Sequence, residues 1–217
     1  THFGLDHRTM VPPLFPVGHN DDGVFAEMLL ALVPGSTIGH IPAAIRHTPP
    51  MRRTADIEGV KRIVPNMSAF VGLVFHEFRP LSGGERTEDA FRRAGALFRS
   101  AGELQASDFC DLIQVHWKRF LARQMSHYLE LLDQYDRTPG FWAEEVDDVI
   151  IGIEHQLRGH SFPVPVELVE TAHRAEHVEI TRRLFRDYGA VLSAWPEIWA
   201  TAKLLKDESI RPTVSLG

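Results

Sequence analysis

Residues 107–135 read SDFCDLIQVHWKRFLARQMSHYLELLDQY, and this stretch decides the fold class. Ser107 followed by Asp108 is typical of a helix start, where a side-chain oxygen accepts a first-turn N–H and a negative charge complements the helix dipole. The side chains that then share one stripe at helical spacing are Phe109, Leu112, Ile113, His116, Phe120 and Leu121. This pattern predicts a long amphipathic helix that packs in a bundle.

The same texture extends over residues 56–205, where helical segments alternate with short breakers. Pro65 divides or kinks the first segment, because a proline lacks the N–H that a helix interior needs. Pro196 fits the first turn of a last helix, where that N–H is not required. We therefore expect about six helices, over 56–78, 87–101, 107–135, 142–158, a segment ending near 188, and 196–206. The tryptophans at 117, 142, 195 and 199 are interpreted as packing residues.

Composition restricts the function classes. The chain has 217 residues, 44% of them hydrophobic, and a net charge of −6, which argues against a general nucleic-acid-binding protein. Cys110 is the single cysteine, so no internal disulfide is possible and a reducing, cytoplasmic compartment is expected. No apolar run reaches the roughly 18 residues of a membrane span, so no transmembrane segment is expected. Because the chain lacks an initiator Met, we expect processing or a longer parent protein.

Residues 20–50 differ from the rest. Asn20 is expected to cap a helix whose first turn contains Asp21 and Asp22, and whose end near residue 33 is set by Pro34 and Gly35. Two short extended pieces, 37–41 and 44–46, should follow. The predicted fold class is thus mainly α, with a short α/β segment before a multi-helix bundle. The corresponding domains are residues 1–54 and 55–217.

The ordered string from Asn20 to His47 resembles the second half of the GT-A fold in family 2-type inverting glycosyltransferases. The shared features are an acidic pair at a helix start, an amphipathic helix, a turn, a strand with a proline, and a histidine soon after. The proline-rich approach at residues 12–16 is also similar to that group. The resemblance covers about 50 residues, and its motifs are short.

This resemblance implies a transferase that takes a sugar from a nucleotide-sugar donor. It aligns Asp22 with the base that removes the acceptor's proton, and Asp21 with the acidic residue before it. His47 matches a ligand of the divalent metal, Mn²⁺ or Mg²⁺, and Arg46 matches a position that contacts the diphosphate. The acceptor would be a protein or a glycan. The helical domain would bind that acceptor, a partner or another subunit, and a homo-oligomer is one such arrangement.

Two departures from the family pattern shape this hypothesis. The usual Glu-Asp pair is Asp-Asp here, which leaves the choice between Asp21 and Asp22 as base open. An Asp-x-Asp metal motif and a nucleotide-binding half are missing ahead of the pair. The chain is therefore interpreted as the C-terminal part of a glycosyltransferase, inactive without the upstream half.

Two alternatives stay open at the level of sequence. A non-enzymatic helical module for protein interaction or oligomerisation would explain the helical dominance without a complete active site. A helical metal-binding bundle could use Glu170 and His173, which are three residues apart, or His173 and His177, which are four apart. A carboxylate-bridged centre needs a second Glu-x-x-His pair, and none is found, so this is the weaker alternative.

Overall fold

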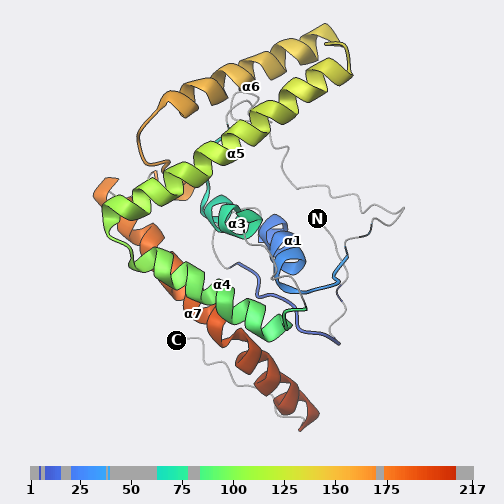
Figure 1. The fold of residues 1–217 in the computed structure, drawn as a ribbon, viewed down its shortest axis with the longest axis vertical. Helices are drawn as coiled ribbons and strands as arrows, with labels where there is room; N and C mark the ends of the chain where they lie inside the picture. Colours follow the sequence, from blue (N-terminus) through green and yellow to red (C-terminus); the bar gives the residue numbers. More distant parts are fainter. Residues whose placement is uncertain are drawn as a thin grey trace, which may run out of the picture.

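The computed structural model describes residues 5, 8–15, 21–37, 39, 63–77, 84–169 and 174–208. These residues form helices and loops and contain no strand, which confirms a mainly α fold (Figure 1). The two extended pieces predicted at 37–41 and 44–46 lie almost wholly outside the described residues. The elements are α1 (Asp21–Leu32), α3 (Met67–Glu77), α4 (Thr87–Glu103), α5 (Ala106–Gln134), α6 (Gly140–Arg158), the 3₁₀ turn η1 (Val166–Leu168) and α7 (Arg174–Asp207).

Helices α4 and α7 lie side by side in opposite directions and form the base of the molecule. Their backbones approach closely because glycines stand at the contact: a Cβ added to Gly95 would lie 2.6 Å from the Gly189 carbonyl oxygen. Phe98 of α4 is fully buried, and its ring lies 5.2 Å from that of Phe185 and 5.6 Å from that of Tyr188, both on α7. Glycine contacts and an aromatic cluster together hold this pair.

Helices α1 and α3 pack against each other and complete the main core with the base. Val24 and Met28 of α1 and Phe70 of α3 are almost completely buried. The Tyr188 hydroxyl of α7 lies 2.7 Å from Met28 Sδ. The main hydrophobic core therefore joins residues from the first 54 positions to the helices that follow.

Helix α3 begins where the sequence places a breaker. Asn66 stands just before it, and its Oδ1 accepts from the Ala69 N–H at 2.6 Å and from the Ser68 hydroxyl at 2.9 Å. The Pro65 carbonyl accepts from the Val166 N–H at 2.9 Å, which attaches the turn η1 to the start of α3. Pro65 thus stands two residues ahead of α3; residues 56–62 of the predicted helix lie outside the described part.

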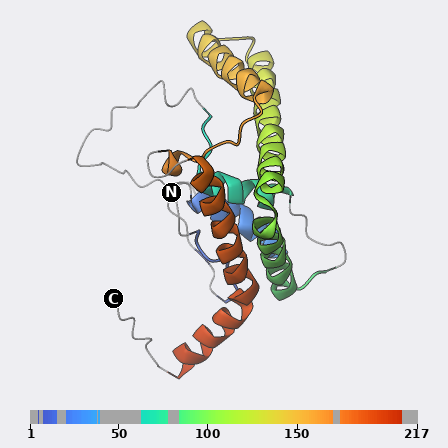
Figure 2. The same ribbon diagram turned by 90° about the vertical axis from the view of Figure 1, so that its left-hand side faces the viewer.

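The second half of α5 leaves the base and forms a projecting hairpin with α6 (Figures 1 and 2). This hairpin has a small core of its own, made of Leu132, Ala143, Val146 and Ile150. Arg137 in the connecting turn has a positive φ of 52°, and its N–H donates to the Leu132 carbonyl at 2.9 Å. Cys110, near the start of α5, is half-buried.

The prediction for Pro196 was wrong. Instead of opening a sixth helix, Pro196 lies inside α7, which continues to Asp207 and bends before its C-terminal end (Figure 2). A proline inside a helix removes one backbone hydrogen bond, and neighbouring contacts can compensate. Here Trp195 Nε1 donates to the Val11 carbonyl at 2.7 Å, and Lys203 Nζ donates to the Arg8 carbonyl at 3.1 Å. The N-terminal segment therefore supports α7 on both sides of the proline.

Candidate functional site

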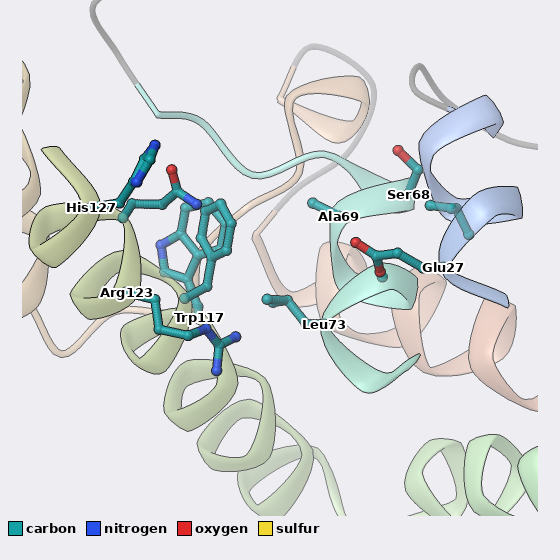
Figure 3. A pocket seen from close by; sticks show the side chains of 11 residues that line it. Glu27, Ser68, Ala69, Leu73, Trp117, Arg123 and His127 are labelled. Carbon is teal, nitrogen blue, oxygen red and sulfur yellow. The ribbon is translucent and has the colours of Figure 1, made fainter. Parts of the chain in front are cut away.

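A pocket of about 420 Å³ opens between α1, α3 and α5, where the hairpin leaves the base. Its volume falls in the range typical of small-molecule sites. Figure 3 shows its two walls, with α1 and α3 on one side and α5 on the other. The lining residues are Val24, Glu27, Ser68, Ala69, Gly72, Leu73, Trp117, Phe120, Arg123, Gln124 and His127.

The first wall is centred on the carboxyl group of Glu27. Glu27 lies one turn after the buried Val24 on α1, so the two side chains share a face. Gly72 of α3 faces this carboxyl group: a Cβ added there would lie 3.0 Å from Glu27 Oε2. Gly72 therefore provides the space that lets the carboxyl group point into the pocket.

The second wall is an aromatic surface on α5. The rings of Trp117 and Phe120 are stacked, with centroids 5.2 Å apart and planes inclined by 27°. Trp117 Nε1 donates to Gln156 Oε1 at 3.4 Å, and Gln156 Nε2 in turn donates to the Ile63 carbonyl at 3.1 Å. This chain of hydrogen bonds fixes the indole ring, and only 5% of Trp117 is exposed. Trp117 in turn supports the half-buried Phe120 ring on which it stacks, and a ring held in place loses little conformational entropy when a ligand binds against it.

The same face of α5 continues with polar side chains. Arg123, Gln124 and His127 follow the aromatic pair at helical spacing and line the pocket beside it. They provide a guanidinium, an amide and an imidazole, which together offer hydrogen-bond donors and acceptors. The aromatic surface is thus bordered by groups that can bind hydroxyl or carbonyl oxygens of a ligand.

Glu27 and Arg123 set the electrostatics of the pocket. Glu27 is exposed as a whole residue, but its carboxyl group lies between the pocket walls. The walls remove part of the water around the carboxyl group, and this raises the pKa of Glu27 above its ordinary value of 4.5. The positive charge of Arg123 acts in the opposite direction and lowers the pKa, but by less than burial raises it. The carboxyl group therefore keeps its proton to a higher pH than an ordinary glutamate.

The structure places the predicted catalytic pair at the beginning of the same helix. Asp21 and Asp22 form the first turn of α1, as predicted, although their side chains lie outside the described residues. They precede Glu27 by five or six residues, a rise of about 8 Å along the helix axis. Arg46 and His47 lie outside the described residues, so their predicted roles stay predictions.

The metal alternatives can be compared only with the described part of the chain. No group of three or more His, Cys, Asp or Glu side chains that could hold a metal ion occurs there. His177 lies on α7 and is 6% exposed, while Glu170 and His173 fall outside the described residues.

Sequence reasoning missed the pocket residues. It interpreted Trp117 as a packing residue, which it is, but it did not identify Glu27, Arg123, Gln124 or His127. A signal was present on α5, because positions 117, 120, 124 and 127 share one helical face that changes from aromatic to polar. A second signal was Glu27, a carboxylate beside the apolar stripe of α1. Neither signal shows that the two helices face each other.

Comparisons with known proteins add no further identification. No protein family, curated protein or solved structure matches this chain. Within the described residues, none of the helices combines the length and the apolar character needed to cross a membrane. The function must therefore be argued from the pocket and the residues around it.

Proposed function

We propose that this chain is the acceptor-binding, C-terminal part of a glycosyltransferase, and that the pocket between α1, α3 and α5 binds a sugar-like acceptor. One observation carries the proposal: a stacked aromatic pair and four polar side chains line a pocket, and one wall of that pocket includes α1, the helix that begins at Asp21. The four polar side chains are Glu27, Arg123, Gln124 and His127. The donor would be a nucleotide-sugar bound by an upstream half.

The chemistry of a sugar matches both walls of the pocket. A pyranose ring has an apolar face of C–H groups and a rim of hydroxyl groups. The apolar face can lie on the half-buried ring of Phe120, which the buried Trp117 ring supports by stacking, and contact with aromatic carbon there replaces water. The hydroxyl groups can then accept hydrogen bonds from Arg123 and Gln124. The carboxyl group of Glu27 can accept hydrogen bonds from the hydroxyl groups on the other side of the pocket.

The proposed transfer follows from the resemblance of residues 20–47. A carboxylate, Asp22 or Asp21, takes the proton from an acceptor hydroxyl as that oxygen attacks the anomeric carbon of the donor. The bond from that carbon to the nucleoside diphosphate breaks, and the diphosphate leaves with its electron pair. The resemblance assigns Arg46, His47 and a divalent metal to the diphosphate, whose negative charge such groups neutralise.

Sugar binding to the pocket can be tested directly. Saturation-transfer NMR of the chain with a panel of mono- and disaccharides should find at least one that binds saturably. Arg123→Gln should weaken that binding about tenfold, because a hydrogen bond to a charged donor contributes roughly 1.5 kcal/mol or more. Arg119→Gln, an exposed position on the same helix outside the pocket, is the matched control. Equal binding by all three proteins would place the sugar elsewhere and contradict the assignment of the pocket.

The transferase assignment needs a separate measurement. In the full-length gene product, Asp22→Asn should abolish sugar transfer while leaving saccharide binding to the pocket intact. Activity retained in Asp22→Asn but lost in Asp21→Asn would move the role of base to Asp21. Activity retained in both variants would contradict the enzymatic part of the proposal without affecting the pocket.

A further inference from the structure

The outer face of α6 carries large apolar side chains that the structure leaves uncovered. Phe141 is 73% exposed and Ile151 is 64% exposed. Ten residues apart, they lie on the same side of the helix, about 15 Å from each other along its axis. The opposite side carries the residues that pack on α5, namely Ala143, Val146 and Ile150.

The region around the turn between α5 and α6 carries a net negative charge equal to that of the whole chain. Residues 129–151, called here the hairpin end, contain seven acidic residues and one basic residue, a net charge of −6. The complete chain has 29 acidic and 23 basic residues, also a net charge of −6, so the remaining residues balance at 22 of each sign. Among the acidic residues, Glu144 and Asp148 lie between Phe141 and Ile151 on the outer face.

The hairpin end is accessible and held in shape before any partner binds. It projects from the base (Figure 1). Arg137 of the turn forms an ion pair with Asp147 of α6, and the rings of Tyr135 and Trp142 meet edge to face at 6.0 Å. A surface that is already ordered loses little entropy on binding.

We infer that the outer face of α6 at the hairpin end docks a basic amphipathic helical segment of another protein. Such a segment would place two apolar side chains, about 15 Å apart, against Phe141 and Ile151, with Lys or Arg opposite Glu144 and Asp148. Opposite charges steer the two surfaces together, and apolar contact then holds them. The same charge disfavours a second copy on this face, which would bring −6 against −6, and disfavours an anionic membrane.

A designed peptide can serve as the probe. A fluorescent 14-residue helical peptide of Leu and Lys, with leucines on one face, should bind the chain saturably in anisotropy titrations. Phe141→Ala with Ile151→Ala should weaken its binding about tenfold, the loss expected when apolar anchors are truncated. Glu144→Gln with Asp148→Asn should weaken binding at low salt and have little effect at high salt, where charges are screened.

Matched controls separate the hairpin end from the rest of the surface. Leu97→Ala with Ile198→Ala removes apolar side chains that are 45% and 46% exposed on the base. Glu103→Gln with Asp111→Asn removes two exposed carboxylates outside the hairpin end. Both control pairs should bind the peptide within about twofold of the wild-type chain. All substituted side chains are exposed, and circular dichroism should confirm that each variant stays helical.

Several results would overturn the inference. Unchanged peptide binding by the Phe141–Ile151 variant would mean that the peptide is held by charge alone and that the apolar face of α6 is not a docking site. Tight binding of the same peptide with Glu in place of Lys would remove the need for a basic partner. Binding of the chain to phosphatidylcholine vesicles, or a dimer in sedimentation, that is lost in the Phe141–Ile151 variant would assign the face to a membrane or to a second copy. Sugar binding at the pocket should be unchanged in every variant, so the two proposals fail independently.

Discussion

The α4–α7 pair and the α5–α6 hairpin are both antiparallel pairs of helices, but different contacts hold them. At the base, glycines bring the backbones of α4 and α7 together, and the Arg186 guanidinium donates to the Gly102 carbonyl at 2.9 Å. In the hairpin, α5 and α6 pack through a small cluster of aliphatic side chains. Close backbone packing beside a fully buried aromatic core is rigid, whereas a small core leaves an element free to open separately. The base should therefore determine global stability, and the hairpin should behave as a less stable unit.

The largest expected effect is at the glycine contact. Gly95→Ala should lower the free energy of unfolding by about 3 kcal/mol, because its Cβ would lie 2.5 Å from the Ser193 backbone nitrogen. Neither backbone can move without disturbing the Phe98 cluster. Urea denaturation measures the change. A loss below about 1 kcal/mol would show that α4 and α7 can separate easily, and the contrast with the hairpin would fail.

The hairpin core should give a smaller and more local effect. Leu132→Ala should cost about 2 kcal/mol, at the low end for a buried leucine, because the small cluster around it can relax. Hydrogen exchange of the variant should speed up for amides of residues 125–150 and stay unchanged in α4. Equal acceleration in α4 and in the hairpin would mean that the whole chain unfolds as one unit.

A glycine in the hairpin should respond in the opposite direction to Gly95. Gly152 lies inside α6, and a Cβ added there meets nothing within 4 Å. Gly152→Ala should stabilise the hairpin by about 0.5–1 kcal/mol, because alanine loses less conformational freedom in a helix. The measurement is hydrogen exchange in α6 beside urea denaturation. Destabilisation by this substitution would indicate an undetected neighbour at that position.

The smallest effect is expected at Glu27 of α1, which lines the pocket between the base and the hairpin. Its pKa is raised in the folded chain, so its contribution to stability is fully present below pH 4.5 and is lost as the pH rises through the raised pKa. Glu27→Gln removes the cost of holding a partly buried charge and should raise the melting temperature at pH 7 by about 1 °C, a small value because water still reaches the carboxyl group. At pH 4 the variant and the wild-type chain should melt together.

The Glu27 prediction has a companion at Arg123, whose charge lowers the pKa of Glu27. Arg123→Gln should move the pH at which Glu27 loses its proton further upward, and NMR titration of the Glu27 side chain can follow it. A downward movement would mean that the Arg123 side chain acts on Glu27 mainly by shielding it from water and not through its charge.

Local signals in the sequence predicted most helix bounds. The predicted helix starts at residues 87 and 107 agree with the starts of α4 and α5 to within one residue, because apolar periodicity acts over a few neighbouring positions. Side-chain capping does not explain the agreement, since the N-cap residues are Arg86 and Gln105 and neither forms a side-chain cap hydrogen bond. Pro196 was misread because sequence signals of this kind are local. Its local pattern fits a helix start, but the contacts of Trp195 and Lys203 with residues 8–11, almost two hundred positions away, are what support a continuous α7.

The mainly helical class, the net charge and the position of the acidic pair at the start of α1 could all be read from the sequence, because each depends on composition or on residues a turn or two apart. The pocket could not. Glu27, Gly72 and Arg123 are each separated by about fifty residues, and only the packing of α1 and α3 against α5 brings them together. The hairpin end could be predicted only in part. Its negative charge is visible in the sequence, whereas the exposure of Phe141 and Ile151 depends on which face of α6 packs on α5.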